Sequence, residues 1–167
     1  MRVLGIDPGL RVTGYAVLEI SSGSSTKEKI HLVEAGVIRT KNNSGVGARL
    51  GLLHRSIQEI IGELKPDCVA IEKLYAHYKH PTTAILMGHA RGVVCALSGL
   101  NNLPLVNIAS THVKKAVSGH GHAGKWQIQK MIQHKLGLAK VPEPPDVADA
   151  IAVAMAAGAH STRTRTT

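Results

Sequence analysis

The sequence has little of several residue types on which other protein classes depend. Its 167 residues include no phenylalanine, one tryptophan and only two cysteines, Cys68 and Cys95. Because these cysteines have neither disulfide-framework nor metal-ligand spacing, they argue against a disulfide-stapled secreted fold and against a cysteine-ligated zinc module. No apolar run approaches the roughly 20 residues of a membrane helix, and an acid interrupts the N-terminus before a signal-like stretch develops. We expect a soluble, cytosolic protein with reduced thiols and no membrane partner.

Acidic residues are missing from a long part of the chain. The formal net charge is +9, and no Asp or Glu stands between Glu72 and Glu143. That segment holds nine lysines and arginines and seven histidines. A solvated surface normally mixes both signs of charge, so we favour contacts with the phosphates of a nucleic acid over a merely basic surface.

The residues that are present predict one α/β domain. The 44% hydrophobic content and the length fit a single domain, which we place at residues 1–158, followed by a polar, flexible tail at 159–167. A strand hairpin followed by alternating strands and helices describes a five-stranded mixed sheet with helices on both faces. The expected strands are Val3–Ile6, Val12–Ile20, Lys29–Arg39, Cys68–Glu72 and Leu105–Ile108, and the expected helices are Val46–Leu64, Thr82–Leu100, Thr111–Val117, Lys125–Leu136 and Asp146–Ala157.

The few acids stand at informative positions. Asp7 and Glu72 each close an apolar strand, and α/β folds place ligands at the edge where such strands end. Asp146 and Asp149 are three residues apart after a Pro-Pro pair, which puts both on one face of the first turn of a helix. Each acid alone also fits an ordinary role as a helix cap or turn residue.

Together the acids predict a metal site. If the two strand ends and the helix meet, their carboxylates repel one another unless cations neutralise them. Mg²⁺ is commonly held by a few carboxylates together with substrate phosphates. An acidic metal site within a basic surface is typical of a nuclease or a phosphotransferase.

Four blocks of the sequence resemble the RuvC-type Holliday-junction resolvases. They are Gly5–Gly9, Ala70–Tyr75, Gly88–Val93 and Asp146–Ala152, in the order and spacing of that family. The resemblance covers about residues 1–158. It implies a ribonuclease-H-like fold and a homodimer that resolves four-way DNA junctions in recombination and repair by paired, symmetric incisions. It also implies the branch-migration complex of RuvA and RuvB as a partner.

The resemblance assigns the four acids to catalysis. Carried over by position, Asp7, Glu72, Asp146 and Asp149 bind two Mg²⁺ ions, with Mn²⁺ as an alternative ion. The implied reaction is in-line hydrolysis of a phosphodiester that leaves 5′-phosphate and 3′-hydroxyl ends. Asp7, at the centre of the sheet, is our candidate for the ligand that both ions share.

Other residues are candidates for DNA contacts. Tyr75 stands where the family places an aromatic residue that stacks on a base, although its ring could instead be buried with its hydroxyl in water. Two lysines fall on family lysines near the active site, and three more are basic candidates, of which Lys115 is equally well explained as a solvated neighbour. The lysines are Lys114 and Lys125, then Lys73, Lys79 and Lys115.

Three points stay open at this stage. Gly88, Gly92 and Ala96 form a smooth stripe on a predicted helix, suited either to a second copy of the chain or to close packing on its own sheet. The histidines at His77–His80 and His120–His122 suit DNA-facing loops better than a zinc site. The rival functions are a pre-ribosomal RNA processing nuclease and a non-catalytic junction-binding or actin-like ATP-binding module.

Overall fold

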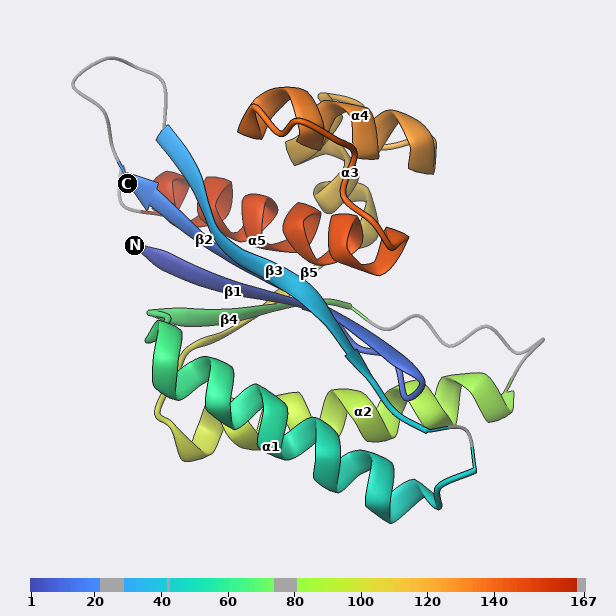
Figure 1. Ribbon diagram of the computed structural model, residues 1–167. Coiled ribbons are helices and arrows are strands. Elements are labelled where there is room, and N and C mark those ends of the chain that lie inside the picture. Colours follow the sequence, from blue (N-terminus) through green and yellow to red (C-terminus); the bar gives the residue numbers. More distant parts are fainter. Residues whose placement is uncertain (22–28, 42, 74–80, 165–167) are drawn as a thin grey trace.

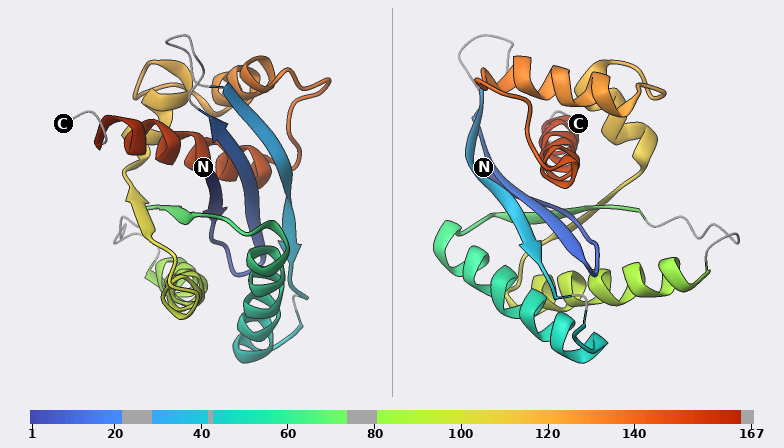
Figure 2. Two further views of the ribbon diagram at one scale, coloured as in Figure 1. Left: turned by 90° about the vertical axis from the view of Figure 1, so that its left-hand side faces the viewer. Right: turned by 45° about the vertical axis from the view of Figure 1, so that its right-hand side comes forward.

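The chain folds around one mixed sheet, shown in Figure 1 and Figure 2. The computed structural model describes residues 1–21, 29–41, 43–73 and 81–164. The strand order is β3-β2-β1-β4-β5; β1 is antiparallel to β2 and parallel to β4, and β4 is parallel to β5. The strands are β1 (Arg2–Asp7), β2 (Val12–Ser21), β3 (Lys29–Arg39), β4 (Cys68–Glu72) and β5 (Leu105–Ile108).

Helices cover both faces of the sheet, and each face has its own hydrophobic core (Figure 1). One face carries α1 (Val46–Leu64) and α2 (Pro81–Leu100); the other carries α3 (Ser110–Ser118), α4 (Lys125–Leu136) and α5 (Pro145–Thr164). This arrangement confirms the predicted five-stranded α/β fold.

The helix α5 continues beyond its predicted end. We expected it to stop at Ala157 and a polar, flexible tail to occupy 159–167, but its backbone is helical through Thr164. No proline follows Pro145 in the sequence, so nothing interrupts the backbone hydrogen bonds of the helix there. The domain boundary at residue 158 stays a prediction.

Two glycines allow α5 to lie directly on the sheet. A Cβ atom at Gly5 of β1 would stand 2.7 Å from the Ala154 backbone nitrogen and closer still to the Ala150 carbonyl oxygen. A Cβ atom at Gly14 of β2 would overlap the Asp146 backbone. Any side chain at these positions would lift α5 off the sheet, so the glycines set how close the start of α5 comes to the end of β1.

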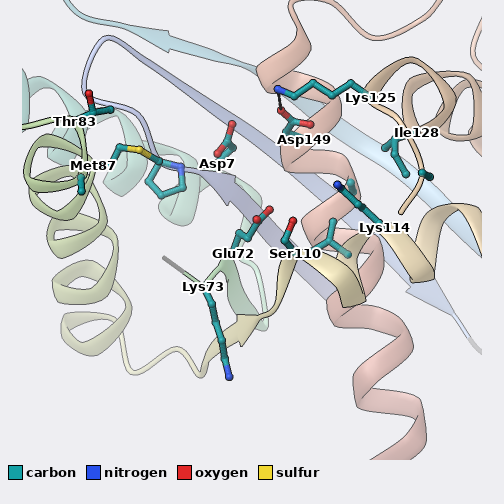
Figure 3. Close-up of a pocket in the computed structure, with 15 residues that line it drawn as sticks. Asp7, Glu72, Lys73, Thr83, Met87, Ser110, Lys114, Lys125, Ile128 and Asp149 are labelled. Carbon is teal, nitrogen blue, oxygen red and sulfur yellow. Dashed lines mark ion pairs between the residues drawn. The ribbon is translucent and has the colours of Figure 1, made fainter. Parts of the chain in front are cut away.

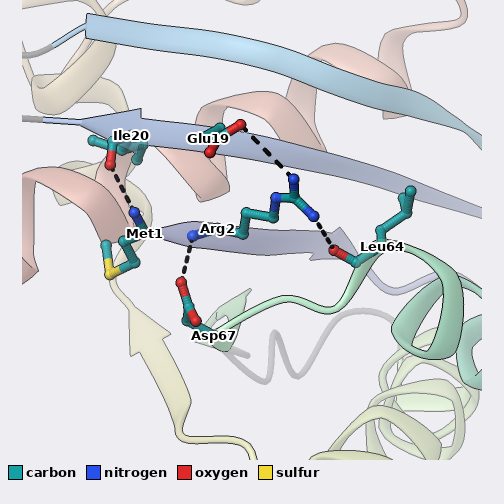
Figure 4. Close-up of polar contacts among 6 residues, drawn as sticks. All are labelled: Met1, Arg2, Glu19, Ile20, Leu64 and Asp67. Atoms are coloured by element: carbon teal, nitrogen blue, oxygen red, sulfur yellow. Dashed lines mark hydrogen bonds and ion pairs between the residues drawn. The ribbon is translucent and has the colours of Figure 1, made fainter.

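Polar contacts fix the opposite end of β1, as Figure 4 shows. The Met1 ammonium donates to the Ile20 carbonyl oxygen at 2.9 Å, and the Arg2 amide donates to Asp67 Oδ2 at 2.6 Å. Arg2 Nη1 also donates to the Leu64 carbonyl oxygen at 3.1 Å. These bonds tie β1 to β2 and to the connection before β4, and thereby hold the register that places Asp7.

The expectation that no apolar segment approaches the length of a membrane helix is wrong for α2. Thr82–Leu100 has the length and composition of a membrane-crossing helix, with a mean hydropathy of 1.3 over its most apolar window. In the fold, one side of this helix packs on the sheet through Ala90, Val94 and Leu97. Only 22% of the window is buried, however, so an apolar side of α2 faces outward.

Candidate active site

Acidic side chains gather where β1 and β4 end. These strands are parallel with Ile6 paired to Ile71, so Asp7 and Glu72 end neighbouring strands at the same edge. Asp149 reaches this edge from the first turns of α5, which lies directly on β1 and β2. Three distant segments of the chain therefore bring carboxylates together, as the strand and helix pattern predicts.

The three carboxylates line a cavity of about 660 Å³. Figure 3 shows Asp7, Glu72 and Asp149 facing a shared space, with Lys73 pointing away from it. Helices from both layers complete the wall, with α2 on one side and α3 and α4 on the other. Their labelled residues are Thr83, Met87, Ser110, Lys114, Lys125 and Ile128.

The electrostatics of the cavity are dominated by burial of the acids and by repulsion between them. Burial, followed by the charges of Asp149, Asp146 and Glu72 in that order, raises the pKa of Asp7 to about 7. Lys125 acts in the opposite direction but does not offset them. The fold therefore favours the protonated form of Asp7 more than water does, because it buries this carboxyl and brings other acids close to it.

Asp149 and Lys125 form an exposed ion pair. Lys125 Nζ lies 3.7 Å from Asp149 Oδ2, and 82% of the lysine side chain is exposed. Burial still raises the pKa of Asp149 against the lowering effect of Lys125. Such exposed pairs contribute little to stability, so breaking this pair would cost little free energy.

The remaining predicted site residues take different positions. Asp146 is in the first turn of α5 and acts on Asp7 and Asp149 through its charge, but it is not among the residues lining the cavity. Lys115 is exposed on α3 and does not line the cavity either. Tyr75 and Lys79 lie outside the described residues.

The sequence analysis missed a residue that holds the end of β4. Arg91 of α2 donates from Nη1 to the Glu72 carbonyl oxygen at 2.5 Å and from Nη2 to Asn107 Oδ1 of β5. The Lys73 amide also donates to the Ile108 carbonyl oxygen at 2.8 Å. Arg91 thus fixes the backbone that carries Glu72, and its position as the one charged side chain of an apolar helix could have signalled this role.

The comparisons with known proteins agree with this geometry. The family described as crossover junction endodeoxyribonuclease RuvC matches residues 3–157. The chain belongs to the RuvC family. Its relatives include the RuvC proteins of Rhodopirellula baltica (43% identity; 92% of this chain, 83% of the relative) and Caldicellulosiruptor saccharolyticus (44%; 93% and 90%). The structure of Thermus thermophilus RuvC in complex with a Holliday junction substrate matches with a TM-score of 0.87 at 30% identity, covering 99% of this chain and 96% of that one.

The RuvC-family cavity offers the donor chemistry of a hard divalent cation. Its described lining includes carboxylates but no thiol or imidazole, and carboxylate oxygen is the ligand that Mg²⁺ prefers. Burial, followed by repulsion from the neighbouring acids, raises the pKa of Asp7, and a cation would relieve the repulsion. Within the described ranges, no three His, Cys, Asp or Glu side chains stand close enough to ligate an ion.

Proposed function

We propose that this RuvC-family chain is a Mg²⁺-dependent endonuclease that resolves four-way DNA junctions by paired, symmetric cuts. The observation that carries the proposal is the convergence of Asp7, Glu72 and Asp149 in a cavity whose wall also bears lysines. The carboxylates repel a phosphate, whereas the lysines attract it, so the site suits DNA only when cations neutralise the acids. Its RuvC relatives are crossover junction endodeoxyribonucleases, and the Thermus structure contains a Holliday junction.

The acids and lysines would have separate roles. Asp7, Glu72, Asp146 and Asp149 would hold two Mg²⁺ ions, with Mn²⁺ as an alternative. When bound, the ions supply charge compensation and Lewis acidity for in-line hydrolysis that leaves 5′-phosphate and 3′-hydroxyl ends. Lys125, already on the cavity wall beside Asp149, would hold the phosphate of the cut strand.

The other basic and aromatic residues would extend the DNA contact. Lys114 lines the cavity and would support Lys125. Tyr75 would stack on a base at the junction centre, and branch migration by RuvA and RuvB would deliver the junction. The remaining candidate phosphate contacts are Lys73, Lys79 and Lys115.

A homodimer through α2 would supply two active sites for paired cuts. A Cβ atom added at Gly88 or Gly92 would meet no other atom within 4 Å, so their stripe does not pack on the chain's own sheet. Ile85 and Leu100 on the same helix are 60% and 73% exposed. A smooth apolar helix face of this kind is suited to its own copy across a two-fold axis. Thr83 and Met87 of α2 also line the active-site cavity, so the dimer would connect the two sites.

Cleavage of labelled substrates tests the proposal. The protein is given an end-labelled four-way junction, a linear duplex of the same sequence and a single-stranded RNA, each with Mg²⁺ or EDTA. We expect paired nicks at symmetric positions on opposite junction strands in Mg²⁺ only. Cutting of RNA alone would instead establish a processing nuclease, and tight junction binding without cutting would establish a binding module.

A matched pair of variants assigns the chemistry to the cavity. Asp7→Asn should bind the junction normally and lose cleavage, because it removes a metal ligand without adding bulk. Asp67→Asn makes the same change in the connection before β4, where the amide oxygen of the new side chain can still accept from the Arg2 amide and keep the register of β1, so cleavage should stay at the wild-type level. Wild-type cutting by Asp7→Asn in Mg²⁺ would overturn the assignment of the acids.

A further inference from the structure

A second cavity lies beside the active site, between the end of α3 and the outer side of α4. It has a volume of about 500 Å³ and shares Ala123 with the wall of the active-site cavity. On α4, Lys125 lines the first cavity and the next residue, Trp126, lines the second. The two cavities are therefore neighbours on one continuous surface.

Trp126 is exposed where a tryptophan would normally be buried. Its side chain is 67% exposed, while Ile128 and Ile132 of the same helix supply the core contacts. Lys130 Nζ lies 5.5 Å from the centroid of the indole ring and holds a positive charge beside it. An exposed indole beside a cation contributes little to the fold, but it offers a flat apolar surface next to a charge.

Basic residues and no acids surround this cavity in the part of the chain that the structure describes. His120, His122 and Lys130 line it, and no acid is among its described lining residues. The turn that carries the two histidines is held in place, because the Ser118 hydroxyl donates to the Lys114 carbonyl oxygen at 2.9 Å and accepts from the His120 amide at 3.2 Å. An aromatic surface rimmed by basic groups matches the base or sugar of a nucleotide and its phosphate.

We propose that this cavity holds one nucleotide of the DNA strand that passes through the active site. Trp126 would pack on its base or deoxyribose, and Lys130 would contact its phosphate together with His120 and His122. The shared wall at Ala123 places this nucleotide next to the phosphate bound at Lys125. The inference rests on the proposed function, which supplies the DNA.

Trp126 is the only tryptophan of the chain, so its fluorescence reports on this cavity alone. Four-way junction DNA is titrated into the Asp7→Asn variant in Mg²⁺, while binding is followed separately by the anisotropy of labelled junction. We expect quenching of the tryptophan emission and protection from acrylamide at the concentrations at which anisotropy rises. Normal anisotropy with unchanged emission and acrylamide access would overturn this inference and leave the proposed function standing. No junction binding even at low salt would overturn both.

Variants measure the contribution of the cavity to binding. Trp126→Ala should weaken junction binding about 5- to 10-fold, and Trp126→Phe should retain most of the affinity, because a base stacks on any aromatic ring. Lys130→Ala should lower the slope of log affinity against log salt by about one. Lys29→Ala is the matched control, since it removes the same charge from an exposed position on β3 that lines neither cavity. Trp126→Ala protein that folds and binds within about twofold of wild type would overturn the inference.

Discussion

The two faces of the sheet are built in different ways. On the face covered by α5, the packing is close and the residues are small: Ala150 and Ala154 are fully buried, and the helix lies against Gly5. On the face covered by α1 and α2, the sheet-facing residues are large, as with Leu53 and Ile57, and the outer side of α2 is left apolar and exposed. Figure 2 shows both layers from two sides.

This difference shows how one sheet separates two tasks. Close packing on the α5 face holds Asp149 near Asp7, although the two carboxylates repel each other. The α2 face leaves its outer surface apolar and exposed, while Arg91 reaches back to the Glu72 backbone. Changes on the first face should therefore affect folding and the acids, and changes on the second should affect assembly and alignment.

The largest effect should follow from adding a methyl group at Gly5. A Cβ there would stand 2.7 Å from the Ala154 nitrogen and even closer to the Ala150 carbonyl oxygen, so α5 must move as a whole. We expect Gly5→Ala to lower the free energy of unfolding by about 3 kcal/mol or more in urea denaturation. Gly62→Ala on α1 meets no atom within 4 Å and should be neutral or stabilising by about 0.5–1 kcal/mol. Equal stability of the two variants would refute the close-packing argument.

A large side chain on the outer side of α2 should disrupt assembly without unfolding the chain. Gly92 is exposed and has free space around it in a single copy, so Gly92→Arg should leave the melting temperature of the monomer near wild type. In the dimer, the arginine would push the two helices apart and raise the dimer dissociation constant about tenfold or more. Sedimentation velocity measures this, with Gly62→Arg as the control. A Gly92→Arg dimer as tight as wild type would place the interface elsewhere.

The elements of the fold could be read from the sequence because each one carries a strong local pattern. All strands and helices begin and end within one residue of their predicted limits, except for the C-terminal end of α5. The mostly polar residues after Gly158 show no apolar residues at helical spacing, so the sequence pattern did not predict a helix there. The backbone hydrogen bonds that continue α5 do not depend on such a pattern.

The site was predictable only in part, because local patterns place single residues but do not reveal contacts between elements far apart in the sequence. The local patterns give the strand ends at Asp7 and Glu72 and the helix start near Asp149, and the parallel pairing of β1 with β4 brings the two strand ends to one edge. The bond from Arg91 to the Glu72 carbonyl oxygen depends on how α2 crosses the sheet, which no short sequence window contains. The role of Gly14, which admits the α5 backbone onto β2, likewise depends on a contact between elements far apart in the sequence.

Arg91 should act as a positioning residue for Glu72. Its guanidinium spans two acceptors, the Glu72 carbonyl oxygen and Asn107 Oδ1, and a lysine cannot reproduce this fork. We expect Arg91→Lys to lower the single-turnover cleavage rate about tenfold, equivalent to one lost hydrogen bond, with unchanged junction affinity. Arg55→Lys, an exposed change on α1, should have no effect. Weaker junction binding at a normal cleavage rate would instead make Arg91 a DNA contact.

The smallest effect should be the dependence of stability on pH in the absence of metal. Because the pKa of Asp7 is raised from 3.8 to about 7, the folded state holds a proton that the unfolded state releases, and stability falls as pH rises between these values. With solvent screening of this partly exposed site, we expect a loss of about 1–2 kcal/mol, or roughly 3–6 °C in melting temperature, between pH 5 and 7.5 in EDTA. Mg²⁺ should remove most of the loss at pH 7.5, since it takes the place of the proton as the compensating charge.

The Asp7→Asn variant separates this effect from general acid dependence. Without the titrating carboxylate, its melting temperature should change less between pH 5 and 7.5 than that of wild type, and Mg²⁺ should stabilise it less. Asp67→Asn, beside the opposite end of β1, should keep the wild-type change of melting temperature with pH. If the melting temperature of Asp7→Asn changed with pH as much as that of wild type, the close approach of the acids would have no effect on stability. The contrast between the two faces of the sheet would then rest on packing alone.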